Sequence, residues 1–250
     1  MEDKAGLFTL KGQTDMSTEF EQEEVRKDWL KADSLLGQVE IIGNAENDLV
    51  SIEGNTDGLE CIGVGTDAAV FIMPELPQYA FKIYSQQALD KKNIEKEVYA
   101  KLKGSPYFAA CYGDGVNYLV LSFEDGPTLQ DCITLGIPVP EQVILDVEEA
   151  RRYVRSVGLN PRDIHLKNVV NQNGRGKVLD VSEYVKEGDD QRWDHLVWAY
   201  YNVYPRFNEI KVPLWVIDAV KKWYHRRNKS VMNLEEFSSK VIRLFDKLMK

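Results

Sequence analysis

The stretch that decides the fold is NPRDIHLKNVVNQNGRGKVLDVSEY, residues 160–184. It contains two short apolar runs, Val169-Val170 and Val178-Leu179. Between them stands Asn173-Gly174, a dipeptide typical of a tight turn between antiparallel strands. The pattern therefore predicts a β-hairpin. Because a hairpin brings its entry and its exit together, polar residues just before the first strand should lie beside those just after the second.

Three such polar residues flank the predicted hairpin. Asp163 and Asn168 stand before it, and Asp180 follows it. All three side chains carry oxygen atoms, which are the ligands that a hard divalent cation prefers. The hairpin thus predicts a site for a divalent cation next to a hydroxyl-bearing substrate.

The composition is that of a folded globular protein. Of the 250 residues, 44% are hydrophobic and 10% are aromatic, which argues against disorder, and the length allows one large domain or two lobes. The formal net charge of −9 argues against a protein that binds nucleic acid mainly through phosphate contacts. We therefore expect no nucleic-acid partner.

Neither the cysteines nor the apolar segments indicate export or membrane insertion. Cys61, Cys111 and Cys132 are far apart and odd in number, which predicts reduced, buried thiols rather than disulfides or a zinc site. The first residues, MEDKAGLFTLKGQ, lack the apolar core of a signal peptide, and the longest apolar runs, such as 118–121, have the length of a strand. These features predict a cytoplasmic protein that does not associate with membranes.

Along the chain, strands come first and helices follow. Residues 1–48 look weakly organised: an amphipathic helix is predicted for 17–37, and the leader as a whole is either an extra β-rich cap or a docking arm. Five strand-like segments then surround one polar helical stretch at 86–103; they are LECIGVG, AAVFIM, YAFKIY, FAACYG and NYLVLSF. After Gly126 the predicted helices are a short one capped by Thr128 and ending at Leu135, and longer ones over about 141–157, 193–204, 214–226 and 234–249.

This order predicts three parts of the chain. They are an N-terminal extension (1–48), a β-rich lobe (49–122) and a helical lobe (123–250), with the link between the lobes at 122–126. A cleft between two lobes is where a ligand is expected to bind.

Two features of the β-rich lobe are candidates for binding an anion. Gly63 and Gly65 lie on a turn between two strands, where backbone amides could approach an anion closely, although two glycines in a hairpin are also a common plain turn. Lys82 shares a strand face with Ala80 and Tyr84. Lys82 is either exposed to solvent or reaches a phosphate while a carboxylate holds it.

The helix after Lys82 offers two carboxylates. On a helical wheel, Glu95 lies nearer than Glu97 to the apolar stripe formed by Ile94, Val98 and Leu102. Glu95 is therefore the predicted partner of Lys82, with Glu97 in reserve.

Taken in chain order, these segments resemble the protein-kinase fold over residues 59–200. GVGTDAAV resembles the glycine-rich loop with Ala68 in place of a third glycine, AFKIY resembles the V-A-I-K strand, and EKEVYAKL resembles the helix that supplies the ion-pair glutamate. LVLSFEDGPTL resembles the hinge, PRDIHLKN resembles H-R-D-x-x-x-x-N, and LDVS stands where D-F-G is expected. The resemblance implies an α+β, bilobal protein-kinase-like fold with a small antiparallel sheet, one main helix in the first lobe, and a reduced, mostly helical second lobe.

The resemblance also implies a role for each candidate site residue. Asp163 would orient the acceptor hydroxyl and accept its proton. The other implied roles are phosphate contact for Gly63, Gly65 and Lys82, positioning of Lys82 for Glu95, Mg²⁺ binding for Asn168 and Asp180, and adenine contact for Ile62, Val70, Ala80, Leu121, Ser122, Phe123 and Val170. Asp194 resembles the buried helix aspartate that braces the catalytic loop, or is a simple carboxylate at a helix N-terminus. ATP and Mg²⁺ are the implied cofactors.

The catalytic loop departs from the family pattern. Pro161 replaces the usual histidine, and His165 stands where serine/threonine kinases carry lysine. His165 is either an acid–base group or a structural loop residue. Lys167 is placed to reach the γ-phosphate instead of the missing lysine.

The segment after the hairpin departs further. Val181-Ser182 replaces Phe-Gly, so the usual switch of this segment is not expected. Only thirteen residues separate Asp180 from Asp194, and no A-P-E motif follows, so regulation by activation-loop phosphorylation is not expected. Arg162 then lacks a phosphorylated partner, and the candidates to replace it are Glu187, Asp189 and Asp190.

The pattern resembles minimal, atypical bacterial serine/threonine protein kinases and, more loosely, lipopolysaccharide, Rio-type and aminoglycoside kinases. It implies an ATP- and Mg²⁺-dependent kinase that acts on hydroxyls of a protein, its own included. A small-molecule kinase of the same fold is one alternative, favoured by the short segment and His165. A pseudokinase that serves as a binding scaffold is another, favoured by Val181-Ser182.

Overall fold

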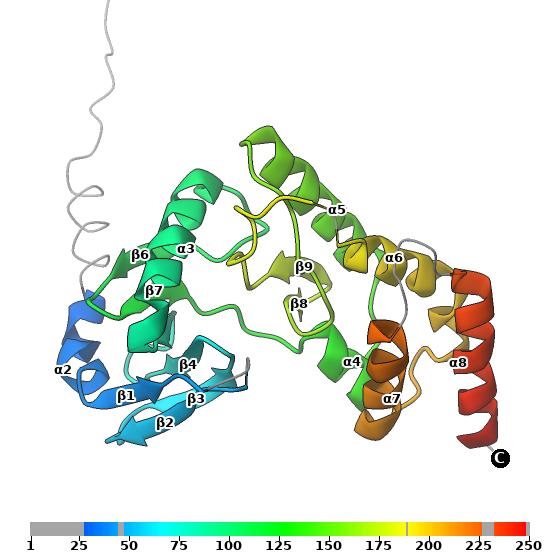
Figure 1. Ribbon diagram of the computed structural model, residues 1–250, viewed down its shortest axis with the longest axis horizontal. Coiled ribbons are helices and arrows are strands. Elements are labelled where there is room, and N and C mark those ends of the chain that lie inside the picture. Colours follow the sequence, from blue (N-terminus) through cyan, green and yellow to red (C-terminus); the bar gives the residue numbers. More distant parts are fainter. Residues whose placement is uncertain (1–27, 45–47, 189, 227–232, 249–250) are drawn as a thin grey trace, which may run out of the picture.

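The computed structural model describes residues 28–44, 48–188, 190–226 and 233–248, and Figure 1 shows that strands gather in the first half of the chain and helices in the second. The order of elements gives two lobes, a β-rich N-terminal lobe and a mostly helical C-terminal lobe. The chain between β7 and α4 joins them.

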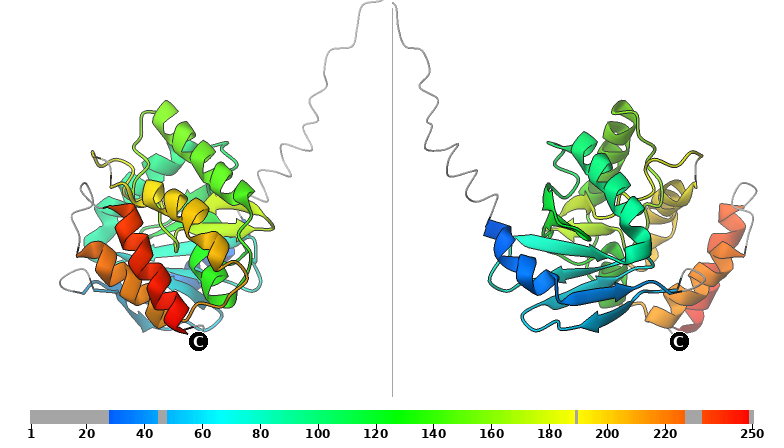
Figure 2. Two further views of the ribbon diagram at one scale, coloured as in Figure 1. Left: turned by 90° about the vertical axis from the view of Figure 1, so that its right-hand side faces the viewer. Right: turned by 60° about the vertical axis from the view of Figure 1, so that its left-hand side comes forward.

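The N-terminal lobe is built on a five-stranded antiparallel sheet of order β3-β4-β5-β7-β6. Its strands are β3 (Glu60–Val64), β4 (Ala68–Ile72), β5 (Tyr79–Tyr84), β6 (Cys111–Asp114) and β7 (Tyr118–Ser122). A short 3-10 turn, η3 (Gln86–Ala88), leads into helix α3 (Leu89–Leu102), which lies between β5 and β6 in the sequence and beside the sheet (Figure 2). The five predicted strands and the single inserted helix are confirmed.

A smaller hairpin covers this sheet. It consists of β1 (Val39–Ile42) and β2 (Ser51–Gly54), preceded by η1 (Asp28–Ala32) and α2 (Asp33–Leu36). Buried side chains from both sides form one cluster, among them Trp29, Leu36, Ile41, Phe71 and Phe81. Strand β1, together with η1 and α2, lies within the predicted leader, and β2 lies past its end. The helix predicted over 17–37 lies mostly outside the described residues.

The C-terminal lobe contains five helices and one hairpin among the residues described. They are α4 (Leu129–Leu135), α5 (Glu141–Ser156), β8 (Val169–Gln172), β9 (Arg175–Val178), α6 (Arg192–Asn202), α7 (Leu214–His225) and α8 (Leu234–Leu248), with a 3-10 turn, η4 (Tyr204–Arg206), after α6. Thr128 caps α4, since its hydroxyl accepts a hydrogen bond from the backbone N–H of Asp131 at 3.1 Å. The predicted helices are confirmed to within a few residues.

The predicted hairpin is also confirmed. Gln172 pairs with Arg175, so the turn is the two residues Asn173 and Gly174, which have φ values of 52° and 86°. These left-handed angles match the right-handed twist of paired strands. Helix α5 packs closely on the hairpin because Gly176 has no side chain: a Cβ there would lie 2.6 Å from Val143 O.

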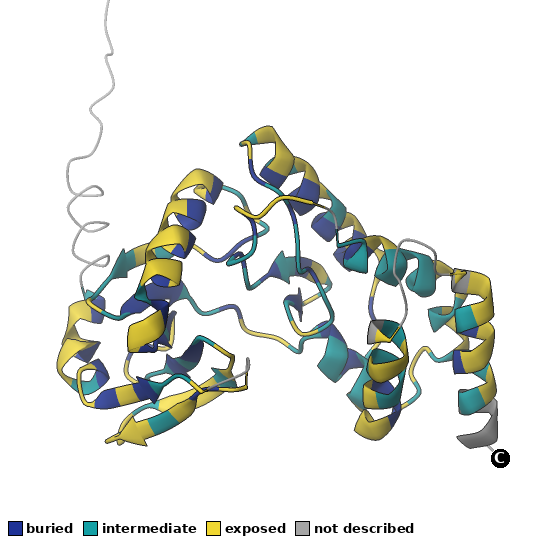
Figure 3. Cartoon of the chain, in the orientation of Figure 1, coloured by how far each residue is buried: buried dark blue, intermediate teal, exposed yellow. Residues whose placement is uncertain are grey.

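Two expectations about burial were wrong. Cys61 is exposed, because it lies on β3 at the edge of the sheet, whereas Cys111 is half-buried and Cys132 buried; all three are free thiols. Ile94 is 39% exposed, and the buried face of α3 instead carries Lys92 and Glu95, which have ionic partners. Figure 3 shows the alternation of buried and exposed residues along this helix. Among the helices described, none is long and apolar enough to cross a membrane.

Candidate active site

The site begins with an ion pair between β5 and α3. Lys82 Nζ lies 2.8 Å from both carboxylate oxygens of Glu95, whose side chain is 1% exposed. The hydroxyl of Tyr84 donates to Glu95 Oε2 at 2.8 Å. Glu97, the reserve candidate, is exposed on the outer side of α3. The sheet and the helix are thus joined by buried, fully paired polar groups.

Lys82 also reaches the C-terminal lobe. Its Nζ lies 3.7 Å from Asp180 Oδ1, directly after the β8–β9 hairpin. Burial by itself lowers the pKa of Lys82, but the charges of Asp180 and Glu95 outweigh burial and raise it, so the ammonium stays charged. Two carboxylates therefore face one cation.

The two carboxylates differ in their environments. Burial raises the pKa of Glu95, and the charge of Lys82 opposes that shift. Burial also acts to raise the pKa of Asp180, but Lys82 and hydrogen bonds from Ser182 lower it. The backbone N–H of Ser182 donates to Asp180 Oδ1 at 2.9 Å. Asp180 is therefore ionised at neutral pH.

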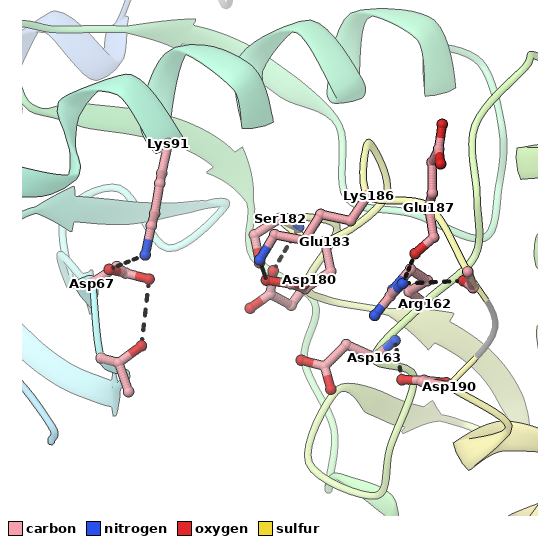
Figure 4. Close-up of polar contacts among 12 residues, drawn as sticks. Asp67, Lys91, Arg162, Asp163, Asp180, Ser182, Glu183, Lys186, Glu187 and Asp190 are labelled. Atoms are coloured by element: carbon pink, nitrogen blue, oxygen red, sulfur yellow. Dashed lines mark hydrogen bonds and ion pairs between the residues drawn. The ribbon is translucent and has the colours of Figure 1, made fainter. Parts of the chain in front are cut away.

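The glycine turn between β3 and β4 is anchored to the same helix. The backbone N–H of Gly65 donates to Ala68 O at 2.8 Å. On β4, Val70 pairs with Gly63 of β3 on one side and with Lys82 of β5 on the other. At the tip of the turn, Asp67 Oδ1 lies 2.6 Å from Lys91 Nζ of α3 (Figure 4). The turn and the Glu95 helix are thereby held together.

The predicted adenine contacts lie on four strands of the N-terminal lobe and one of the C-terminal lobe. Ala80 and Leu121 are buried neighbours on β5 and β7, Val70 is half-buried on β4, and Ile62 on β3 is 44% exposed. Val170, on β8, is buried and bridges to Thr128. The first four come from one lobe and Val170 from the other.

The two hinge residues use their own N–H groups within the protein. Ser122 donates to Ala110 O at 2.8 Å, and Phe123 donates to Gln78 O at 2.9 Å. Neither N–H group is therefore free to bind a nucleotide base.

The loop before β8, which the sequence predicts to be the catalytic loop, holds Asp163 in an unusual conformation, with φ of 54°. Non-glycine residues adopt such angles only where their surroundings fix them. The carbonyl of Asp163 accepts from Asn168 Nδ2 at 3.1 Å, and its N–H donates to Asp190 Oδ2 at 2.9 Å. The backbone carbonyl of Asn168 in turn accepts from the N–H of Leu179 at 2.8 Å, which ties the loop to the strand leading into Asp180.

The carboxylate of Asp163 forms an ion pair with Arg192, the first residue of α6. Arg192 is itself held by Asp190, whose Oδ1 accepts from the N–H of Arg192 at 3.1 Å. Burial raises the pKa of Asp163, and the charge of Arg192 opposes that shift.

His165 lies close to Asp163, with Nε2 4.0 Å from Asp163 Oδ1. Burial and the neighbouring charge of Arg192 lower the pKa of His165 to about 4, so its imidazole is neutral at pH 7. His165 Nδ1 accepts from the backbone N–H of Lys167 at 3.2 Å. Lys167 is exposed, and in the described part of the chain no ion pair joins it to a carboxylate.

Of the two roles predicted for Asp194, the brace of the catalytic loop is wrong, and the carboxylate in the first turn of a helix is confirmed. Its carboxylate pairs with Arg151 of α5 at 2.8 and 3.1 Å and is 51% exposed, so it does not touch the catalytic loop. Asp190 braces the loop instead. Gln191, between Asp190 and α6, has φ of 55°, and this turn places Asp190 beside Asp163.

Arg162 contacts backbone rather than an acidic side chain. Its Nη1 donates to the carbonyls of Glu187 and Gly188, the latter at 3.1 Å (Figure 4). Of its three predicted partners, Glu187 thus contributes a carbonyl, Asp190 binds the Asp163 N–H, and Asp189 lies outside the described residues.

Asn168 and Asp180 carry oxygen atoms of the kind that bind Mg²⁺ in proteins. Because Asn168 uses its amide nitrogen on Asp163 O, the oxygen of that amide is its remaining metal-binding group, and Asp180 is ionised. The residues described contain no cluster of three or more His, Cys, Asp or Glu that could hold a metal. Mg²⁺ is commonly bound by only one or two carboxylates, together with waters and phosphate oxygens.

Three site residues, Tyr84, Tyr99 and Arg192, were given no role by the sequence, and Asp190 was predicted only as a partner of Arg162. The Tyr99 hydroxyl donates to Leu179 O at 3.0 Å, next to Asp180. Strand alternation from Lys82 already placed Tyr84 on the site face, so only its role was missed. Nothing in the sequence marks Arg192 as a partner of Asp163.

These contacts and the two lobes define a protein-kinase-like fold. No family model matches the chain. It is 29% identical over 205 residues to "Putative serine/threonine-protein kinase YrzF" of Bacillus subtilis (strain 168), a match that covers 78% of this chain and 94% of that protein. It is 31% identical over 114 residues to testis-specific serine/threonine-protein kinase 3 of Mus musculus, covering 44% of this chain and 38% of that one.

Among solved structures, the chain is similar to a crystal structure of the Rad53 kinase domain and SCD2. The sequence identity is 21%, half of each chain is covered, and the TM-score is 0.39.

Proposed function

We propose that this protein is an ATP- and Mg²⁺-dependent kinase that transfers the γ-phosphate to serine or threonine hydroxyls of proteins. The observation that carries the proposal is the contact between the lobes: Lys82 Nζ lies 2.8 Å from Glu95 and 3.7 Å from Asp180. Phosphoryl transfer asks a protein mainly for positioning and for neutralisation of charge. A fixed cation facing an ionised carboxylate across two lobes meets both needs.

The residues of the chain divide the work as follows. Lys82, fixed by Glu95, would contact the nucleotide phosphates, and the glycine turn held by Asp67 and Lys91 would cover them. Asn168 and Asp180 would hold Mg²⁺, which when bound neutralises phosphate charge. The hydroxyl of the acceptor would lie at Asp163.

Asp163 would orient the hydroxyl and take its proton. Its raised pKa suits a general base, since a base with a pKa nearer the working pH is the better proton acceptor. Arg192, paired with that carboxylate, provides the positive charge that His165 lacks in its neutral form.

The test is labelling with ATP and Mg²⁺. The purified chain should phosphorylate itself or a generic protein substrate. Asp163→Asn should abolish the labelling while keeping the thermal stabilisation by Mg²⁺-nucleotide. Asp194→Asn is the matched control, because Asp194 lies on α6 but pairs with Arg151, and it should label normally.

Two outcomes would contradict the proposal. If Asp163→Asn labels as well as the parent, the activity comes from another site or another protein. If Mg²⁺-nucleotide does not stabilise the parent, a binding scaffold without catalysis is the better description.

A further inference from the structure

A half-open cavity of about 510 Å³ lies in the C-terminal lobe, enclosed by α4, α6, α7 and α8. Its wall is mainly apolar and includes Ile133, Trp193, Ala199, Val216 and Phe237. Helices α7 and α8 have a core cluster of their own, separate from the one that joins the two lobes. The cavity lies where these two clusters adjoin. Cavities of this volume hold a drug-sized molecule or a few large side chains.

The cavity reaches the catalytic loop. His165, Lys167 and Arg192 form part of its wall. Arg192 pairs directly with the Asp163 carboxylate, and His165 Nε2 lies 4.0 Å from it. A chain seated in the cavity would therefore be one side chain away from the proposed base.

The wall near the loop is basic. Lys221 of α7 lines the cavity, and burial together with the charge of Lys167 lowers the pKa of Lys221. Lys221 Nζ donates to Gln130 Oε1 at 2.5 Å, and no ion pair to a carboxylate is found for Lys167 or Lys221 within the part of the chain that is described. An apolar hollow with two lysines at one end suits a peptide that carries several bulky apolar residues and has acidic side chains elsewhere in its sequence.

The chain itself contains such a peptide. Residues 1–13 read MEDKAGLFTLKGQ, in which Thr9 has leucine and phenylalanine on its two sides, with a further leucine at position 7. The other Ser and Thr residues among positions 1–27, which are Thr14, Ser17 and Thr18, lack paired apolar neighbours. Seventeen residues separate Leu10 from Asp28, where the described structure begins. Fully extended, that length spans roughly 60 Å, long enough for contact with its own site or with that of a second copy.

We propose that the cavity is the acceptor subsite of the proposed kinase and that it takes residues 7–10, so that Thr9 is an autophosphorylation site. The proposal rests on the proposed function. In the step, the Thr9 oxygen forms a bond to the γ-phosphorus, the bond from that phosphorus to the bridging oxygen breaks, ADP leaves, and the hydroxyl proton passes to Asp163.

The first experiment compares two synthetic acceptors with the full chain as the enzyme. One is MEDKAGLFTLKGQ, and the other has alanine in place of both leucines and the phenylalanine. We expect kcat/KM for the first peptide to be at least 10-fold higher. Equal kcat/KM values for the two peptides would overturn the proposed subsite. Phosphorylation of small amphiphilic alcohols without phosphorylation of either peptide would also overturn it.

The second experiment fills the cavity. Ala199→Phe should raise KM for the apolar peptide about 10-fold while leaving KM for ATP and the stabilisation by Mg²⁺-nucleotide unchanged. Ala100→Phe, at an exposed site on α3, is the matched control. If Ala199→Phe does not fold, Val220→Phe on α7 fills the same cavity. A filled variant that uses the apolar peptide as well as the parent does would overturn the proposal.

The third experiment locates the phosphate. Mass spectrometry of the autophosphorylated parent should find it on Thr9, and Thr9→Ala should lose most of the label. Label that is unchanged in Thr9→Ala but lost in Asp163→Asn would refute this acceptor and leave the proposed function intact. The absence of any Asp163-dependent label, with any acceptor, would instead refute the proposed function. If the rate of autophosphorylation per molecule falls when the protein is diluted, one copy of the chain phosphorylates Thr9 of another copy.

Discussion

Replacing Glu95 by glutamine tests directly how the ion pair of Lys82 with Glu95 couples the two lobes. Glutamine has nearly the same shape, and its carbonyl can still accept from the Tyr84 hydroxyl, so the change removes little except the negative charge. Lys82 loses two charge-assisted hydrogen bonds of 2.8 Å. It keeps Asp180 at 3.7 Å as its remaining partner.

The expected loss of stability follows from burial. Lys82 and Glu95 are 14% and 1% exposed, so solvent screens their attraction weakly. Breaking a buried pair by removing one partner typically costs about 3–5 kcal/mol, but Asp180 still neutralises the lysine. We therefore expect the free energy of unfolding to fall by about 2 kcal/mol, which for a chain of this size lowers Tm by roughly 4–8 °C.

The effect on activity should be larger. Without Glu95, the lysine is drawn toward Asp180, the carboxylate that the proposed mechanism needs for Mg²⁺. We expect kcat/KM to fall about 100-fold, equivalent to about 2.7 kcal/mol of transition-state stabilisation. Thermal unfolding and initial rates measured on the same preparation separate the two effects.

Glu97→Gln is the matched control, since Glu97 lies two residues away on the same helix but is exposed. It should leave Tm and kcat/KM unchanged. If Glu95→Gln behaves like Glu97→Gln, the ion pair does not couple the lobes. A variant that loses stability but keeps its kcat/KM would show that the pair is structural only.

Two further predictions concern the catalytic loop. Arg192→Gln should lower kcat about 10-fold and move the acid limb of the profile of kcat against pH to higher pH. The reason is that Arg192 lowers the pKa of Asp163, and a general base must be deprotonated to act. An acid limb that stays in place, or moves to lower pH, would count against the pairing of Arg192 with Asp163. His165→Asn should remove part of the acid sensitivity of folding. The imidazole has a pKa of about 4 in the folded chain against its ordinary value of 6.5, so the unfolded chain binds the proton more readily and stability is lost as pH falls through this range. The His165 side chain is 34% exposed, which reduces the effect. In urea unfolding, the free energies of unfolding of parent and variant should differ by about 1–2 kcal/mol at pH 5 and should be equal at pH 7.5. Equal losses of stability on acidification in the two proteins would refute this prediction.

The parts of the fold that depend on local pattern could be predicted from the sequence. The β8–β9 hairpin follows from Asn173-Gly174, because few residue pairs adopt left-handed angles at both turn positions. The contact of Lys82 with Glu95 follows from two periodicities, that of a strand and that of a helix. Each of these signals lies within a few residues of the group that it positions.

The parts that were missed depend on contacts between distant segments. The sequence pattern indicated Asp194 as the brace of the loop, whereas the turn at Gln191 brings Asp190 to Asp163. The ion pair of Arg192 with Asp163 joins positions 29 apart, and no local pattern encodes it. The cavity likewise depends on how α7 and α8 pack against α6, which periodicity does not specify.

The segment between Asp180 and α6 is ordered by fixed contacts rather than by a phosphate. Arg162 binds two backbone carbonyls there, and Asn160 Nδ2 donates to Lys186 O and Gly188 O at 2.8 and 2.7 Å. Val181, at the position of the usual phenylalanine, is fully buried in the core. The Nη1 group of Arg162 would have to leave these carbonyls to bind an added phosphate. Control of such an enzyme is therefore better sought at the acceptor than in this segment, because the catalytic loop is braced before any modification occurs.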